Sequence, residues 1–166
     1  MKLIVAVTKN WGIGKNGTML VHLPADLKYY REKTTGNVTI MGLKTYNALP
    51  VRPLPNRTTI VLTRDKNFID DRIIIVHSLE ELFEKIKHFP NKEIYVCGGA
   101  TIYNQLIDYC DKALITKINT IKDADTFFPN IDKMQNWELI SATEPQINNN
   151  LEYTFVEYKN NKIKQV

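Results

Sequence analysis

Cysteine, histidine, glycine and proline are all scarce in this chain of 166 residues, which holds 2 Cys, 3 His, 7 Gly and 7 Pro. Two cysteines, Cys97 and Cys110, cannot build a disulfide framework, and without a secretory signal we expect both to be reduced thiols. The histidines share no metal-ligand spacing with either cysteine, so a metal centre is not expected. No Ser/His/Asp or Cys/His arrangement is evident, which argues against a covalent nucleophile.

Long apolar runs and a strong excess of one charge are also missing. The longest apolar runs, residues 3–7 and 73–76, are far shorter than the roughly 20 residues that span a bilayer. The 22 Lys and Arg against 18 Asp and Glu leave a net charge of only +4. With no basic stripe and no recognition motif, a nucleic-acid partner is not expected either. We expect a cytoplasmic protein with no membrane partner, made of one domain, 1–166, with its core in 1–158 and a basic tail in 159–166.

Short runs rich in β-branched residues alternate with stretches of helical periodicity. Interior strands of one sheet are predicted at residues 2–8, 38–41, 59–63, 73–76 and 93–97. Helices are predicted at residues 24–34, 43–49, 79–88 and 100–107. Later strands are predicted at 113–118, 137–142 and 152–158, the last two forming an antiparallel hairpin across the turn-rich residues 145–150. The pattern indicates a single-domain α/β fold with a mixed, mostly parallel sheet of about eight strands, whose carboxyl ends are the place to search for a site.

Residues 12–17, Gly-Ile-Gly-Lys-Asn-Gly, match the dinucleotide-binding fingerprint literally. That fingerprint requires a helix at its third glycine and an acid about 20 residues later. Here a helix can begin only at Pro24, and the region near Asn37 offers no acid. We therefore interpret the segment as a mobile loop and reject a standard Rossmann site. Ordinary turn geometry explains its glycines equally well.

Asp26 lies in the first turn of the predicted helix 24–34, at the edge of a face formed by Leu23, Leu27, Tyr30 and Thr34. An acid in a first turn has a simple explanation, because it interacts favourably with the helix dipole. Its position beside an apolar stripe also makes it a candidate anchor for a cationic or amidine-like group.

Three other predicted strand ends carry groups that suit phosphate. Residues 40–45 and 96–101 each run from a strand through glycine into a helix, and Thr63-Arg64 follow a third strand. Free helix N–H groups and donor side chains together favour an extended phosphorylated ligand. Close packing of helix on strand is the alternative explanation for these glycines.

The order and spacing of six segments resemble those of the dihydrofolate reductases. The segments are Gly12-Ile13-Gly14, Leu23-Pro24-Ala25-Asp26-Leu27, Ile40-Met41-Gly42 with Thr45, residues 52–57, Gly98-Gly99 with Tyr103, and residues 125–129. The resemblance runs from Leu3 to Tyr158. It implies NADPH-dependent reduction of 7,8-dihydrofolate to tetrahydrofolate for one-carbon metabolism, with hydride transfer to pterin C6 and protonation of N5. It further implies a monomer that binds dihydrofolate and NADPH, with antifolates such as trimethoprim or methotrexate as candidate ligands.

The resemblance also implies roles for individual residues. Asp26 would hold the pterin and promote N5 protonation through solvent, with Thr116 and Met19 as its catalytic companions, and Arg57 would pair with the glutamate carboxylate of the substrate. The implied substrate-binding residues are Ile4, Val5, Ala6, Asp26, Leu27, Tyr30, Leu49, Leu54, Arg57, Cys97 and Thr116. The implied cofactor-binding residues are Ala6, Ile13, Gly14, Gly17, Met19, Gly42, Leu43, Lys44, Thr45, Leu62, Thr63, Arg64, His77, Cys97, Gly98, Gly99, Ala100, Thr101 and Tyr103. The pair Gly98-Gly99 matches a family pair that is joined by a cis peptide.

Three features depart from the family pattern. Leu20-Val21 replace the usual Pro-Trp, so the indole that orders an active-site water is missing, and Leu43 replaces an arginine that contacts the cofactor phosphates. An extra residue, Pro50 or Val51, precedes Arg52. Two alternatives therefore stay open: a related pteridine or pyrimidine reductase, and a catalytically impaired folate- or nucleotide-binding module.

Overall fold

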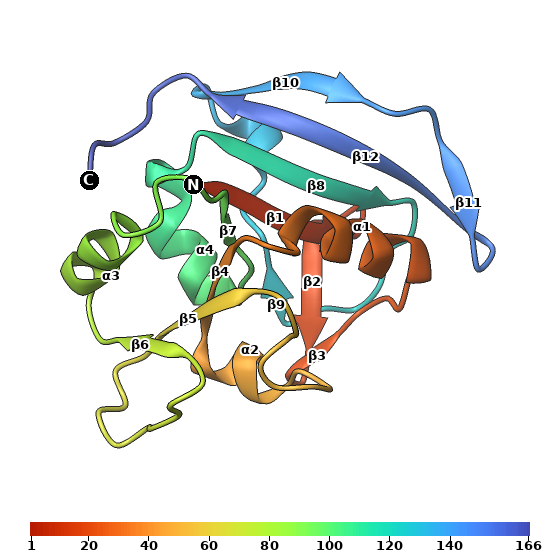
Figure 1. The fold of residues 1–166 in the computed structure, drawn as a ribbon. Helices are drawn as coiled ribbons and strands as arrows, with labels where there is room; N and C mark the ends of the chain where they lie inside the picture. Colours follow the sequence, from red (N-terminus) through yellow and green to blue (C-terminus); the bar gives the residue numbers. More distant parts are fainter.

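The computed structural model describes all residues, 1–166, and is built on one sheet of nine strands (Figure 1). Eight of them follow the order β10-β12-β8-β1-β7-β4-β5-β6, and β11 pairs with β12. Their bounds are β1 Lys2–Val7, β4 Val38–Gly42, β5 Thr58–Leu62, β6 Ile74–Val76, β7 Ile94–Val96, β8 Lys112–Ile118, β10 Trp137–Ala142, β11 Gln146–Asn148 and β12 Leu151–Asn160. The strands from β8 to β6 run parallel to one another, and β12 is antiparallel to β8, β10 and β11. This confirms the predicted α/β fold with a mostly parallel sheet, except that β6 is an edge strand and not an interior one.

Four helices flank this sheet: α1 Pro24–Thr34, α2 Leu43–Asn47, α3 Leu79–Ile86 and α4 Ala100–Leu106. Each lies where a helix was predicted, but α2, α3 and α4 end one or two residues earlier, and a short 3-10 turn, Ile107–Tyr109, follows α4. None of these helices is long and apolar enough to cross a membrane.

Alternate residues of the central strands face opposite layers of the core. Leu3 of β1 belongs to the main cluster with Leu82 of α3 and Leu106 of α4. Its neighbour Ile4 belongs to a second cluster, against which Tyr30 of α1 packs. Helix α1 therefore covers one face of the sheet, while α3 and α4 cover the other (Figure 1).

A second sheet of three short strands has the order β3-β2-β9, formed by β2 Gly12–Lys15, β3 Thr18–Met19 and β9 Thr126–Phe127. The segment 12–17, interpreted from the sequence as a mobile loop, thus forms a strand and the turn of a short hairpin, which the sequence did not predict. The turn between β2 and β3 has positive φ at both central residues, Asn16 at 52° and Gly17 at 77°. Asn-Gly favours such two-residue hairpin turns because both residues tolerate positive φ.

The carboxyl-terminal part of the chain forms the predicted antiparallel pair, β10 with β12, but also an unpredicted strand. Residues 145–150 are not all turn, because β11 pairs with β12 and the tight turn is confined to Asn149 and Asn150. Strand β12 continues to Asn160, which is 2% exposed and donates a hydrogen bond from Nδ2 to the Cys110 carbonyl at 2.9 Å. The strand predicted at 152–158 therefore ends two residues later than expected.

Candidate active site

The register of the parallel strands brings their carboxyl ends together along one edge of the main sheet. Ala6 of β1 is level with Thr116 of β8, and Gly42 of β4 is level with Leu62 of β5. Leu62 is in turn level with Val76 of β6. The predicted site residues that follow these strands therefore lie along this edge, although they come from distant parts of the sequence.

Asp26 and Thr116 meet at this edge. The Thr116 hydroxyl, 1% exposed, donates a hydrogen bond to Asp26 Oδ1 at 2.6 Å. Burial raises the pKa of the half-buried Asp26, and the hydrogen bond from Thr116 offsets part of that effect. No lysine, arginine or histidine forms an ion pair with this carboxylate. A carboxyl in such surroundings keeps its proton to higher pH than an exposed aspartate does.

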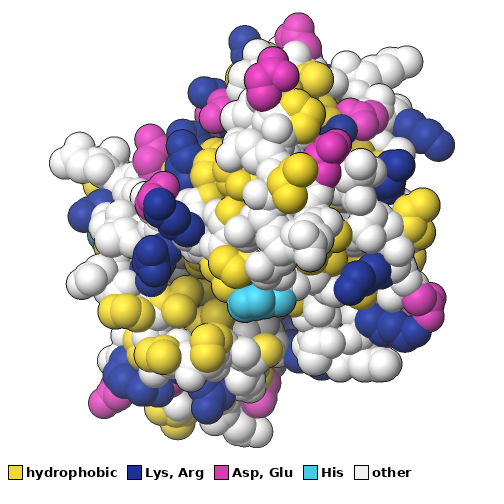
Figure 2. Space-filling view, turned by 90° about the vertical axis from the view of Figure 1, so that its right-hand side faces the viewer, with side chains coloured by type: hydrophobic (Ala, Val, Ile, Leu, Met, Phe, Trp, Pro, Cys, Tyr) yellow, Lys and Arg dark blue, Asp and Glu magenta, His cyan; other side chains and the backbone are white.

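Apolar side chains from α1 and the sheet surround this acid. Ile4 of β1 is 5% exposed and packs with Tyr95 and Leu114, against which Tyr30 of α1 rests. Leu27, one residue after Asp26, is 40% exposed although the sequence pattern placed it with Leu23 on one apolar face. Leu27 is thus an apolar side chain that the fold leaves uncovered beside the acid. Figure 2, which views the molecule from the side of α1, shows groups of hydrophobic side chains open to solvent near Lys and Arg side chains.

Arg57 is half-buried and lies next to the end of α1. Its Nε donates to Thr34 Oγ1 at 3.1 Å and its Nη1 donates to the Pro55 carbonyl at 3.0 Å. No carboxylate of the chain pairs with this guanidinium, and its Nη2 has no acceptor in the protein. The support that Thr34 gives Arg57 was not predicted, since the sequence shows only the place of Thr34 on the helix face. The predicted neighbours Leu49 and Leu54 are half-buried in the segment between α2 and β5.

The Gly98–Gly99 peptide is cis, as the resemblance implied. Gly98 has φ 113°, and a Cβ there would lie 3.3 Å from the Tyr103 ring. The Tyr103 hydroxyl donates to the Ile4 carbonyl at 2.7 Å, and the Gly42 N–H donates to the Gly98 carbonyl at 2.9 Å. These contacts join β1, β4, the end of β7 and α4 at one point, where a side chain at residue 98 would be crowded by Tyr103 and strained by the positive φ.

Cys97 precedes this glycine pair and is half-buried. Burial raises the pKa of its thiol to about 12, so the group stays protonated at neutral pH. This agrees with the expectation that Cys97 is no nucleophile.

Hydrogen-bond donors gather where β4, β5 and β6 end, and we call this group the polar rim. Its members are the exposed Lys44 and Arg64 and the half-buried Thr45, Thr63 and His77. The Thr63 N–H donates to the Val76 carbonyl at 3.0 Å, and His77 Nδ1 lies 2.8 Å from the Thr63 carbonyl. That ring nitrogen must carry a proton to make this bond. These backbone and side-chain contacts join the ends of β5 and β6.

Leu43 opens helix α2 beside the polar rim and packs against the buried cluster of Met41, Tyr46 and Val61. It therefore makes apolar contacts where an arginine would offer donors. The other predicted cofactor residues lie along the same edge or in the second sheet. Leu62 ends β5, Ala100 and Thr101 open α4, and Gly17 forms the turn of the β2–β3 hairpin.

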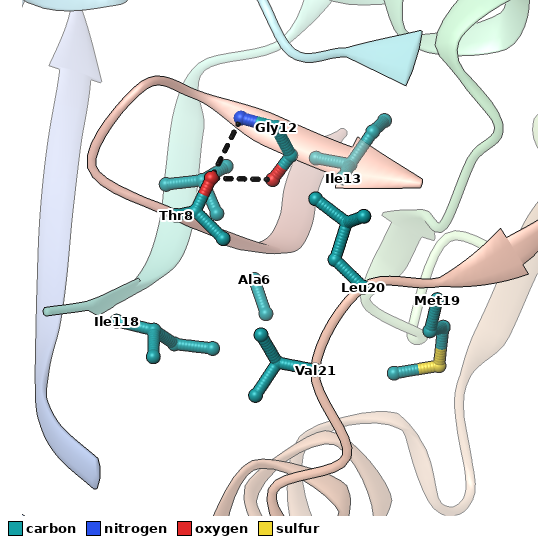
Figure 3. Close-up of a pocket in the computed structure, with 9 residues that line it drawn as sticks. Ala6, Thr8, Gly12, Ile13, Met19, Leu20, Val21 and Ile118 are labelled. Carbon is teal, nitrogen blue, oxygen red and sulfur yellow. Dashed lines mark hydrogen bonds between the residues drawn. The ribbon is translucent and has the colours of Figure 1, made fainter. Parts of the chain in front are cut away.

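A small cavity of about 20 Å³ lies between the β2–β3 hairpin and β1 (Figure 3). It is lined by Ala6, Val7, Thr8, Gly12, Ile13, Met19, Leu20, Val21 and Ile118. Val21 points toward Ala6 and Ile118 in Figure 3, and it is 8% exposed. Thr8 carries the only hydroxyl among the residues that line the cavity. This hydroxyl donates a hydrogen bond to Asn10 Oδ1 and accepts one from the Gly12 N–H. Val21 therefore seals an apolar space and offers no donor to solvent.

Comparison with known proteins gives a consistent picture. The family model described as dihydrofolate reductase matches residues 1–160. The dihydrofolate reductase of Haemophilus influenzae is 42% identical over 137 residues, which are 82% of each chain. That of Bacillus subtilis is 36% identical over 161 residues, 96% of this chain and 94% of the relative. The structure of the Enterococcus faecalis enzyme, complexed with NADP(H) and RAB-propyl, superimposes with a TM-score of 0.86 at 34% identity, covering 96% of this chain and 95% of the other. A family match over residues 1–160, with relatives 36% and 42% identical over most of their length and a solved structure of the same fold, means that this protein belongs to the dihydrofolate reductase family.

Proposed function

We propose that Asp26, held by Thr116, is the acid of the reaction that this dihydrofolate reductase catalyses, the reduction of 7,8-dihydrofolate to tetrahydrofolate by NADPH. The observation that carries the proposal is the 2.6 Å hydrogen bond from Thr116 to Asp26 Oδ1. It fixes one carboxylate oxygen and leaves Oδ2 free for a ligand. An ionised carboxylate accepts hydrogen bonds well from an amidine-like pair of N–H groups, which is what the pterin ring offers.

Protonation near Asp26 follows from its surroundings. Burial raises the pKa of this carboxyl, so a proton remains available closer to neutral pH than it would on an exposed aspartate. Because no cation pairs with the carboxylate, the proton is not displaced by a fixed positive charge. Asp26 would then promote protonation of the substrate through solvent, as a general acid near the working pH does.

The other half of the substrate would lie along α1. Arg57 keeps one free guanidinium nitrogen, and a guanidinium is well suited to a planar carboxylate such as that of the glutamate. Leu27, Tyr30, Leu49 and Leu54 would cover the aminobenzoyl ring between these two charged groups. The 40% exposure of Leu27 supports this placement, because a bound ring would cover an apolar side chain that the protein does not.

The residues at the strand ends fit NADPH. Neither Lys44 nor Arg64 pairs with a carboxylate of the chain, so both charges remain available for phosphate groups. Thr45, Thr63 and His77 would add donors to the same polar rim. Ala6, Ile13, Cys97 and Tyr103 would enclose the nicotinamide and exclude water from it. The bound cofactor supplies the hydride.

The decisive experiment compares NADPH and NADH as reductants of 7,8-dihydrofolate with the purified protein. We expect oxidation of NADPH that depends on dihydrofolate, with a clear preference over NADH. No turnover of dihydrofolate under conditions that reduce another pterin would indicate a related pteridine reductase. Tight ligand binding with negligible turnover would indicate a binding module.

A cytoplasmic location is part of the same proposal. Cys97 and Cys110 are both free thiols. Unpaired cysteines favour a reducing compartment, where thioredoxin and glutathione keep thiols reduced.

A further inference from the structure

The first turn of α1, which carries Asp26, has one backbone donor that the helix itself does not satisfy. The N-cap residue is Leu23, which has no side-chain acceptor, and Pro24 has no N–H. The N–H groups of Asp26 and Leu27 both donate to the Leu23 carbonyl, at 2.9 and 3.1 Å. Ala25 is therefore the residue of this turn whose N–H needs a partner from elsewhere.

That partner is Asn148, which lies 123 residues further along the chain. The Ala25 N–H donates to Asn148 Oδ1 at 3.1 Å. Asn148 is the last residue of β11 and pairs with Leu151 across the turn formed by Asn149 and Asn150. Both turn residues have positive φ, 50° and 60°, as in the tightest two-residue hairpins. The acceptor that caps α1 thus lies in a paired strand next to a tight turn and not in an irregular segment.

The same hairpin packs on α1 through side chains. The rings of Tyr29 on α1 and Phe155 on β12 are stacked, with centroids 4.1 Å apart and an interplanar angle of 16°. Leu23 belongs to the buried cluster that includes Tyr153 of β12. Phe155 is also level with Thr116 in the pairing of β12 with β8. The hairpin therefore contacts the helix of Asp26 and, through β8, the residue that holds its carboxylate.

We propose that Asn148 is a positioning residue for Asp26: by capping the Ala25 N–H it fixes the first turn of α1 and so sets the geometry in which Asp26 meets Thr116 and the substrate. The inference rests on the proposed role of Asp26. The positioning role is inferred because Ala25 directly precedes Asp26. No other residue separates the capped N–H from the residue that carries the carboxylate. A displaced first turn would lengthen the hydrogen bond between Asp26 and Thr116, and small displacements of a reacting group are costly.

The direction of the expected pH effect follows from the groups around Asp26. Burial raises its pKa and the hydrogen bond from Thr116 lowers it, so a weaker bond leaves the pKa higher. The charge of Asp26 raises the pKa of two nearby tyrosines, Tyr29 on α1 and Tyr103 on α4. Burial raises the pKa of Tyr29 to about 12 and that of Tyr103 also upward, so both stay neutral in the working range. Glu157 of β12 acts on Tyr29, and no Lys, Arg or His forms an ion pair with Asp26.

The test compares Asn148→Ala with Asn148→Asp, which keeps an acceptor oxygen at the same distance along the side chain. Ile147→Ala is the matched control, because Ile147 is the neighbouring β11 residue and is 74% exposed. In Asn148→Ala we expect amide exchange at Ala25 to accelerate roughly tenfold, the effect of losing a helix cap. We also expect kcat to fall several-fold and the midpoint of the pH profile to move to higher pH. Asn148→Asp should restore the protection of Ala25, and Ile147→Ala should change none of these quantities.

Faster exchange at Ala25 with an unchanged kcat and pH profile would overturn the proposal, because Asn148 would then cap the helix without positioning the acid. Unchanged exchange at Ala25 would overturn it as well. The titration of the Asp26 carboxyl, followed directly by NMR or infrared spectroscopy, separates this inference from the proposed function. If Asp26→Asn leaves turnover intact, the proposed function fails, whereas an upward shift of the Asp26 titration in Asn148→Ala would still support the positioning role.

Discussion

Around Asp26 the site holds a single acid in apolar surroundings, whereas the polar rim after β4, β5 and β6 holds several donors, of which Lys44 and Arg64 are exposed. The acid has one protein hydrogen bond, from the buried Thr116. The rim offers the exposed Lys44 and Arg64 to solvent or to a ligand, and neither of these two cations has a carboxylate partner in the protein. Burial strengthens each interaction of the acid, while water and salt screen those of the rim. Loss of one group should therefore matter greatly at the acid and little at the rim.

The largest effect is expected for Asp26→Asn. An amide cannot promote protonation of the substrate, so turnover at pH 7 should fall by about 100-fold to 10,000-fold, the usual contribution of a positioned acid or base. Activity should recover partly as the pH falls, because solvent then protonates the substrate before hydride transfer. Steady-state kinetics with dihydrofolate and NADPH between pH 5 and 8 measure both effects. Wild-type turnover at pH 7 in the folded variant would show that Asp26 is not the acid.

A smaller effect is expected at the rim for Leu43→Arg. A new guanidinium beside Lys44 should tighten NADPH binding by about threefold to tenfold, since an exposed ionic contact adds only about 1 kcal/mol. Binding should become more sensitive to salt. Titration of NADPH by fluorescence gives the dissociation constant, with Leu43→Met as a control that keeps the apolar contacts to Met41 and Tyr46. The same affinity for both variants would mean that Lys44, Arg64 and their neighbours already satisfy the phosphates.

The smallest effect is expected for the thermal stability of the same Asp26→Asn variant. Burial raises the pKa of Asp26 in the folded state, so its charged form is less stable in the fold than in the unfolded chain. Its contribution to stability is therefore greatest below the unfolded pKa and is lost as pH rises through the folded pKa. Asp26→Asn should raise the melting temperature at pH 7 by about 1 to 3 °C, and this gain should vanish at low pH. Thermal unfolding at pH 7 and pH 4 tests the sign, and a lower melting temperature for the variant at pH 7 would contradict it.

Local pattern and strand spacing were enough to predict the sheet, the four helices and the position of Asp26 at a helix start. Thr116 and Arg57 were predicted only through the family resemblance, because a threonine on a buried strand or a lone arginine carries no signal of its own. The structure shows what a local pattern could not: Thr116 on β8 pairs with Ala6 on β1, so both residues lie at the same edge of the sheet. The roles of these residues stay predictions until the variants are measured.

The parts that the sequence did not reveal are those that depend on contacts between distant segments. The β2–β3 hairpin was interpreted as a loop because its strands are short and its other partner, β9, lies more than 100 residues away. Strand β11 was hidden in a polar segment whose one large apolar residue, Ile147, is 74% exposed. No local pattern connects Asn148 with Ala25. Such contacts are decided by tertiary packing and not by local propensity.

Strand β1 is the first strand of the sequence and lies between β8 and β7 in the sheet. The two strands that pair with β1 lie much later in the sequence: Lys2 pairs with Tyr95 of β7 on one side and with Lys112 of β8 on the other. A growing chain must therefore reach residue 118 before its central strand has both neighbours. Closing two loops of roughly 100 residues slows folding and keeps an unpaired apolar strand open in the meantime. During synthesis this enzyme should thus acquire its acid site and its sheet together and late, after β8 has emerged from the ribosome, and its nascent chain is exposed to aggregation until then.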